Sequence, residues 1–259
     1  MPKKTEKLVR KTFEEHYQDL KFRVILAVLW FVLCTAICFF IAEEIYNILV
    51  APLAKAFNYK EGRKLIFTGL AEGLTTYIKL SLYAGFFLSF PFIIAQVYLF
   101  TAPGLYKKEK AIFLSYIISS TLLFVLGTTM VYFLVIPTAW RFFLSFEKFG
   151  FNSNLPILLE ARISEYLDLI LDLIIGFGLA FQLPIILVIL ISMEIIKVNH
   201  LVEFRRYAIV IIFIVAAILT PPDVFSQIIL ALPLLLLYEI SIILGKLINK
   251  KKNVGHKIY

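Results

Sequence analysis

The sequence predicts an all-helical, polytopic membrane protein whose six transmembrane helices form a kinked, concave bundle. Three observations predict this fold class: 61% of the 259 residues are hydrophobic, only 17% are charged, and the mean hydropathy is +0.88. Soluble domains are about 45–50% apolar and roughly 25% charged. The composition therefore excludes a disordered chain and indicates a chain divided into membrane spans of roughly 20 residues each.

Four apolar segments are long enough to cross the hydrocarbon core, and they predict spans at residues 24–42, 80–101, 111–138 and 168–193. The preceding segment, residues 1–23, is basic like a signal peptide. Its polar part is long and no small-x-small cleavage site follows the apolar run, so we expect it to be retained as a cytoplasmic segment.

The last apolar region, residues 207–247, is interrupted by Pro221 and Pro222. Two consecutive prolines remove two amide donors and disfavour helix in the residue before them, which predicts separate spans at 207–219 and 225–247. The first of these has 13 residues and a length of roughly 20 Å. We expect it either to thin the bilayer or to be shielded by neighbouring helices. With the tail at 248–259, the chain forms one domain over 1–259.

Lysine and arginine are distributed unequally between the two sides of these spans. One side, with the N-terminal segment, the second and fourth loops and the tail, holds 18 of the 26 basic residues. The positive-inside rule therefore predicts that both termini are cytoplasmic. The net charge of +8 is explained by this topology, and no nucleic acid partner is expected.

The motifs of common enzymes and metal sites are missing from the sequence. The three histidines lie in separate polar segments without an HExxH pattern, and Cys34 and Cys38 fall on one helix. No GxxxxGK[ST] motif occurs in the sequence. The residues also offer no combination of nucleophile, base and orienting group that would form a catalytic site. We therefore expect no catalytic residues, no metal and no cofactor.

Several polar residues fall inside or beside apolar segments. Gln182 and Glu239 lie within them, where an unpaired polar group costs several kcal/mol, so both are site hypotheses. For Gln182 a functional contact and a plain interhelical hydrogen bond are both open, whereas Glu239 lies nearer a helix end and is expected to be structural. Asp168 and Asp172 are one turn apart, and a solvated helix end is favoured over an intramembrane protease dyad.

Acidic residues also occur on the basic side of the predicted bundle. Glu14, Glu15 and Asp19 precede the first span, and Glu109 lies in a short loop among lysines. Such charges are usually only a solvated surface. Carboxylates can also bind the guanidinium group of an incoming peptide through paired hydrogen bonds, a geometry that lysine cannot reproduce.

Five stretches of sequence carry a resemblance to a known family. Residues 16–23 read HYQDLKFR, 51–53 read APL, 96–109 contain QVY and APGLYKKE, 177–184 read FGLAFQLP, and 219–227 read LTPPDVFSQ. In this order, over residues 12–247, they resemble the TatC family, the receptor subunit of the twin-arginine protein translocase, whose first motif reads H-L-x-E-L-R-x-R. APxLYxxE and TPPDxxSQ are together highly specific.

The resemblance implies a core component of the Sec-independent (Tat) translocase, which exports folded proteins using the proton motive force. It implies binding of twin-arginine signal peptides, homo- and hetero-oligomers with single-span subunits of the TatA and TatB type, and contact with membrane lipid. The implied location is the bacterial inner membrane, with an organelle membrane of bacterial origin less favoured. The alternative function class is a small secondary transporter or channel with a polar path through the bundle.

The resemblance also implies roles for individual positions. Asp19 and Glu109 would contact the arginines of the signal peptide. Phe100 would support the binding of that peptide. Lys21 and Arg23 occupy the family's basic positions beside Asp19. Partner contacts or structural roles fall to four further residues, which are Pro52, Pro91, Gln182 and Asp223.

The chain departs from the family at three of these positions. Asp19 is shorter than Glu, Lys21 replaces Arg, and Gln182 cannot ionise. We therefore expect Glu109 to carry more of the recognition, and Gln182 to act only through hydrogen bonds, which argues against a proton-coupling role at this position.

Overall fold

The structure is a computed structural model that describes residues 13–57, 64–101, 110–149, 159–193, 195–220 and 224–256. These residues form helices, with one isolated parallel bridge between Ile66 and Arg162, which confirms the predicted all-helical class. The helices are α1 Phe13–Phe40, α2 Ala42–Ala56, α3 Glu72–Thr101, α4 Lys110–Met130, α5 Ile136–Ser145, α6 Ile163–Ala180, α7 Leu183–Ser192, α8 Val198–Leu219 and α9 Val224–His256. A π-helical segment, Val131–Val135, joins α4 to α5, and a 3-10 turn, Phe146–Phe149, follows α5.

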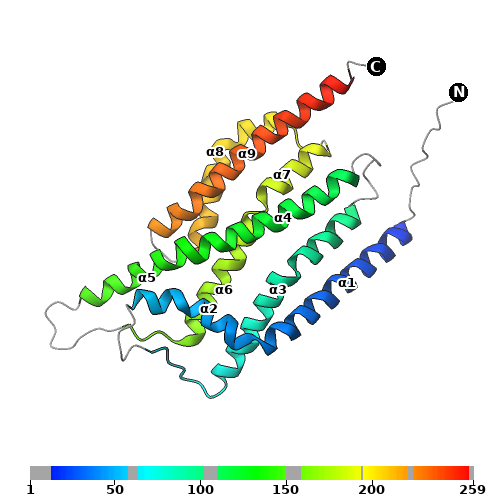
Figure 1. Cartoon of the computed structure of the whole chain (residues 1–259). Helices are drawn as coiled ribbons and strands as arrows, with labels where there is room; N and C mark the ends of the chain where they lie inside the picture. The colour runs from blue at the N-terminus through cyan, green and yellow to red at the C-terminus, as the bar shows by residue number, and fades with distance from the viewer. Residues whose placement is uncertain are drawn as a thin grey trace.

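The long helices lie side by side, and α1 begins at the same end of the bundle at which α9 ends (Figure 1). We call this end the inner end, after the predicted topology, and the opposite end the outer end. Helix α1 packs on α3, α4 packs on α6, and α8 and α9 form an antiparallel pair. The prediction that both termini lie on the cytoplasmic side of the membrane stays a prediction.

Five helical stretches are long and apolar enough to cross a membrane: Glu14–Phe40, Glu72–Phe100, Leu114–Ser145, Ile163–Ser192 and Gln227–Ile248. They overlap five of the six predicted spans. Most are longer than predicted because their helices continue through polar turns at the ends, as where α3 begins at Glu72. Helix α8 has three charged residues in its inner half, so the sixth span at 207–219 stays a prediction.

The first loop contains a helix that the sequence did not predict. Helix α2 lies at the outer end of the bundle, where Leu49, Pro52 and Leu53 are buried and Glu43 and Glu44 are exposed (Figure 1). With 15 residues it is too short to cross the membrane, and only uncharged segments of span length indicated helices in the sequence. Its buried side chains belong to the same hydrophobic core as α6 and α9.

Two prolines, Pro184 and Pro137, lie at interruptions of regular α-helix, whereas Pro52, Pro91 and Pro233 lie inside continuous helices. Pro184 has no amide hydrogen to donate to the carbonyl of Ala180, and the fourth span divides there into α6 and α7. The carbonyl of Gln182, at the break, accepts hydrogen bonds from the amides of Ile185 and Ile186, both at 3.1 Å. The π-helical segment lies directly before Pro137, where a widened turn accommodates the missing donor.

Two glycines allow the close approach of neighbouring helices. A Cβ atom on Gly85 of α3 would lie 2.6 Å from the Cα atom of Thr35 in α1, closer than two carbon atoms can pack. A Cβ atom on Gly178 of α6 would lie 2.4 Å from the ring of Phe124 in α4. Small residues at these contacts allow tight packing, which drives helix association in lipid.

Substitution of Gly85 by alanine tests the contact between α1 and α3. We expect Gly85→Ala to lower the free energy of unfolding by about 1–3 kcal/mol, because the methyl group must displace the backbone of α1. The matched control is Gly73→Ala on the same helix, where no atom lies within 4 Å of the new Cβ. Thermal unfolding of the purified protein in detergent measures both, and equal midpoints would contradict the packing argument.

Candidate functional site

The inner end of α1 meets the inner end of α3 through aromatic contacts. The ring of His16 lies 4.6 Å from the ring of Phe100, centroid to centroid, and farther from this end Trp30 of α1 stacks on Phe92 of α3 at 4.4 Å. These contacts hold Phe100, the penultimate residue of α3, beside the beginning of α1. The loop that carries Glu109 starts one residue after α3 ends, and Glu109 itself lies outside the described residues.

Two of the predicted charged residues on α1 share the face that turns toward α3. His16, Asp19 and Arg23 are three and four residues apart, which places them on one side of a helix. Arg23 donates from Nε to Oδ1 of Asp19 at 3.1 Å, and both side chains are about four-fifths buried. Lys21 is exposed and lies about 200° around the helix from Asp19, so the structure does not bring it to this face.

Gln182 lies at the junction of α6 and α7 and is 7% exposed. Its Oε1 accepts a hydrogen bond from the hydroxyl of Ser120 in α4, and its Nε2 donates to the carbonyls of Ser120 at 3.1 Å and Gly178 at 3.4 Å. The side-chain amide is therefore satisfied inside the chain. Of the two roles left open for Gln182, the interhelical hydrogen bond is present, and the partner contact stays a prediction.

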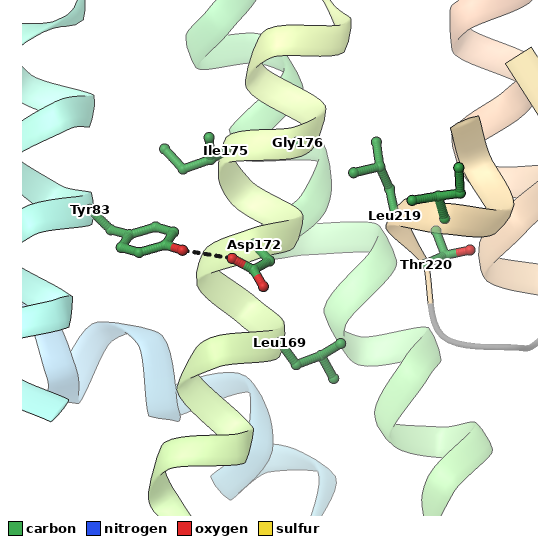
Figure 2. A pocket seen from close by; sticks show the side chains of 8 residues that line it. Tyr83, Leu169, Asp172, Ile175, Gly176, Leu219 and Thr220 are labelled. Atoms are coloured by element: carbon green, nitrogen blue, oxygen red, sulfur yellow. Dashed lines mark hydrogen bonds between the residues drawn. The ribbon is translucent and has the colours of Figure 1, made fainter. Parts of the chain in front are cut away.

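The bundle has a pocket with polar side chains, and Gln182 does not line it. A pocket of about 450 Å³ lies between α3, α6 and the end of α8, and its polar side chains are Tyr83, Asp172 and Thr220 (Figure 2). Gln182 follows Asp172 by ten residues, about 15 Å along a helix, and it faces α4. Gln182 and this pocket therefore lie at different depths of the bundle.

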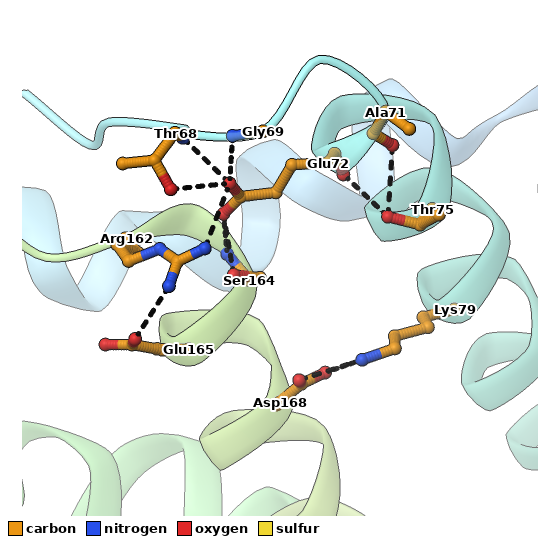
Figure 3. A network of polar contacts seen from close by, with 10 residues as sticks. All are labelled: Thr68, Gly69, Ala71, Glu72, Thr75, Lys79, Arg162, Ser164, Glu165 and Asp168. Carbon is orange, nitrogen blue, oxygen red and sulfur yellow. Dashed lines mark hydrogen bonds and ion pairs between the residues drawn. The ribbon is translucent and has the colours of Figure 1, made fainter.

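Helices α3 and α6 are joined by two polar pairs one turn apart. Nζ of Lys79 contacts both carboxylate oxygens of Asp168, at 2.9 and 2.8 Å, and the hydroxyl of Tyr83 donates to Oδ1 of Asp172 at 2.7 Å (Figures 2 and 3). The two acids begin in the second turn of α6 and bind the neighbouring helix. This corrects the expectation of a solvated helix end.

A polar cluster at the outer end, centred on Glu72, was not predicted. Its carboxylate accepts hydrogen bonds from the amide nitrogens of Thr68 at 2.8 Å and Gly69 at 3.1 Å, and from the hydroxyl of Ser164 at 2.6 Å (Figure 3). Arg162 approaches it at 3.4 Å. The sequence feature that could have indicated this cluster is an acid in the first turn of a helix. Its partners Arg162 and Ser164 lie about 90 residues away and could not be identified from the sequence.

Pro52 lies where α2 is hydrogen-bonded to the rest of the bundle. Pro52 lies inside α2 and cannot donate to the carbonyl of Ile48, which accepts a hydrogen bond from the hydroxyl of Tyr132 at 2.8 Å instead. The hydroxyl of Tyr166 donates to the next carbonyl, that of Leu49, at 2.6 Å. Two tyrosines from the bundle thus hold α2 at the proline.

The remaining predicted residues are distributed over the bundle. Pro91 lies inside α3, and Asp223 lies outside the described residues. Glu239 forms an ion pair with Arg205 of α8, with 2.7 Å between Oε2 and Nη2, in keeping with the structural role expected for it. Within the described part of the chain, no three His, Cys, Asp or Glu side chains gather as metal ligands would.

Comparison with known proteins identifies relatives over most of the chain. The family model described as "Sec-independent protein translocase protein (TatC)" matches residues 15–233. A protein of that name from Rickettsia prowazekii is 46% identical over 95% of this chain and 97% of its own, and one from Magnetococcus marinus is 40% identical over 92% and 85%. A crystal structure titled as the twin arginine translocase receptor TatC is 39% identical, covers 91% of this chain and 100% of its own, and superimposes with a TM-score of 0.75.

Removal of the Ser120 hydroxyl tests the interhelical hydrogen bond. We expect Ser120→Ala to lower the free energy of unfolding by about 0.6–2 kcal/mol, because Oε1 of Gln182 then loses its donor. Ser241→Ala is the matched control, since that buried hydroxyl bonds only the carbonyl of Leu237 in its own helix. Unfolding in detergent measures both, and a loss for Ser241→Ala as large as for Ser120→Ala would contradict the assignment.

Proposed function

This chain belongs to the TatC family of Sec-independent protein translocase proteins, and we propose that it binds twin-arginine signal peptides of folded cargo at its inner end. The observation that supports this most is the largely buried carboxylate of Asp19, on the face of α1 that packs against Phe100. An acid on the side that holds most of the basic residues is suited to attract a guanidinium group.

The proposed binding surface consists of Asp19, Arg23, Phe100 and Glu109. Nε of Arg23 donates a hydrogen bond to Oδ1 of Asp19, which holds this carboxylate on the face of α1 that turns toward α3. A carboxylate accepts two parallel hydrogen bonds from arginine, and lysine offers only a point charge. The shorter side chain of Asp19 leaves more of the recognition to Glu109, and Lys21 contributes charge to the surface without a direct contact.

We place the chain in a translocase with single-span subunits of the TatA and TatB type, in the bacterial inner membrane, driven by the proton motive force. The support is family membership together with the five membrane-spanning stretches. On this proposal both termini are cytoplasmic, the chain works in homo- and hetero-oligomers, and α8 provides a sixth, short crossing. The transporter or channel alternative has no support in the relatives, which are named as translocase proteins.

Crosslinking of a signal peptide tests the receptor function. A photoreactive peptide with two arginines is added to membranes that contain the full chain, and we expect an adduct in the region of residues 102–109. Replacing both arginines by lysines should abolish the adduct, because lysine cannot form the paired hydrogen bonds. Equal adducts with the two peptides would contradict the proposal.

Two variants of Asp19 test whether this residue, and not a neighbouring acid, contacts the signal peptide. Asp19→Asn should reduce the adduct about tenfold, since a neutral amide holds a guanidinium poorly, and Asp19→Glu should retain it. Glu14→Gln, which removes an exposed acid five residues earlier, should leave the adduct unchanged.

A further inference from the structure

Arg206 of α8 is attached at the depth of a membrane-spanning stretch. The hydroxyl of Tyr238 in α9 donates to the carbonyl of Leu201 in α8 at 2.9 Å. Nearer the outer end, Nε2 of Gln227 in α9 donates to the carbonyl of Phe213 in α8 at 3.1 Å. Arg206 lies between these two contacts. It is therefore level with a part of α9 that belongs to the membrane-spanning stretch beginning at Gln227.

Arg206 has no carboxylate partner within the described part of the chain. The neighbouring Arg205 forms the ion pair with Glu239, with 2.7 Å between Nη2 and Oε2. The guanidinium of Arg206 lies instead over the ring of Tyr207, with its Cζ 5.0 Å from the ring centroid. A charge at membrane depth is costly unless an anion pairs with it, so Arg206 requires an anion from outside the chain.

Helix geometry directs the side chain of Arg206 toward the inner end of the bundle. Helix α8 begins at that end, because it is antiparallel to α9, which ends there (Figure 1). Side chains of a helix tilt toward its N-terminus, so the long side chains of α8 extend inward. Arginine can lay its hydrocarbon stem on apolar surface while its guanidinium reaches the headgroups. Tyr207, which is 50% exposed, belongs to a residue type enriched at that interface.

Glu203 adds an opposite charge one turn closer to the inner end. Residues three apart share a face of a helix and are separated by about 4.5 Å along its axis. The side chains of Glu203 and Arg206 are both exposed, and in the described structure they form no ion pair with each other. This face of α8 therefore presents a cation at the deeper position and an anion nearer the water.

This order of charges matches the headgroup of phosphatidylethanolamine. Its phosphate lies next to the acyl chains, and its ammonium follows toward the water after a two-carbon linker. Arg206 can bind the phosphate through paired hydrogen bonds, and the carboxylate of Glu203 can accept hydrogen bonds from the ammonium. Val210 and Ile214 continue the same face toward the outer end, and both are exposed, so they offer aliphatic surface to an acyl chain.

Other common headgroups match this face less well. The headgroup of phosphatidylglycerol has no cation for Glu203. The ammonium of phosphatidylcholine carries three methyl groups and has no N–H to donate to a carboxylate. The chemistry of Arg206 and Glu203 together therefore favours a headgroup with a primary ammonium.

We propose that Arg206 and Glu203 form a binding site for the phosphoethanolamine headgroup of a phospholipid on the inner half of α8. The inference rests on the proposed sixth crossing, because that crossing places Arg206 in the membrane. It also explains how the short apolar part of α8 is accommodated. A headgroup held at the depth of Arg206 covers a charge that would otherwise face acyl chains.

Site-specific photocrosslinking tests this site. The full chain, with a photoreactive amino acid in place of Val210, is reconstituted into vesicles that hold equal amounts of phosphatidylethanolamine, phosphatidylglycerol and phosphatidylcholine with identical acyl chains. The mass of each adduct identifies its headgroup. We expect phosphatidylethanolamine to be enriched at least about threefold over the other two lipids, because only its headgroup pairs with both side chains.

Variants of the two charged residues separate the site from a general attraction to lipid. Glu203→Gln should abolish the enrichment over phosphatidylcholine, because the ammonium loses its carboxylate, and Glu203→Asp should retain it. The exchanged chain, with Glu203→Arg and Arg206→Glu, keeps the net charge and should lose the enrichment, because the order of the charges is reversed. Glu14→Gln removes an exposed acid at the inner end of α1 and should leave the enrichment unchanged.

Four results would overturn the proposal. They are adducts in proportion to the vesicle composition, enrichment of either other lipid, no lipid adduct at position 210, and an enrichment that Glu203→Gln leaves unchanged.

The failure of this inference is distinguishable from failure of the receptor function. The arginine and lysine signal peptides are crosslinked in the same vesicles. If the arginine peptide alone reacts and no headgroup is enriched at position 210, the lipid site fails and the receptor function stands. Equal reaction of both peptides overturns the receptor function whatever headgroup position 210 contacts.

Discussion

Polar side chains that pair with partners on neighbouring helices determine how the apolar helices of this bundle are arranged. Gln182 bonds Ser120, Glu239 pairs with Arg205, and the hydroxyl of Tyr132 takes the place of the donor that Pro52 lacks. Each partner lies on a different helix. Because lipid offers neither donors nor acceptors, these contacts fix which helices are neighbours, while apolar packing alone would allow many arrangements.

The contact between α3 and α6 shows this most clearly. Lys79 and Asp168 are 89 residues apart, and so are Tyr83 and Asp172. An equal offset at two successive turns means that the helices run in the same direction and in one register. Glu72 and Ser164 continue the contact to the outer end (Figure 3). Helix α3 is thereby fixed in the outer half, and its inner end carries Phe100 to His16 on α1.

The sequence predicted the helical class, the approximate positions of five long apolar helices, and a division of the last apolar region between residues 219 and 225, because these depend on local hydropathy and on proline. It did not predict α2, because the uncharged stretch between Glu44 and Lys55 is too short to cross a membrane. It also misjudged Asp168 and Asp172, because their partners are 89 residues away and no local pattern records them. Gln182 was recognised as significant, but the side of the helix it faces depends on packing against α4.

A charge exchange between α3 and α6 tests the account most directly. The free energy of unfolding is measured in detergent for Lys79→Asp, for Asp168→Lys and for the chain with both changes. The account predicts that each single change, which places like charges opposite each other, costs about 1 kcal/mol or more, and that the double change restores most of the loss. Losses that add in the double variant would contradict the claim that this pairing holds the two helices in register.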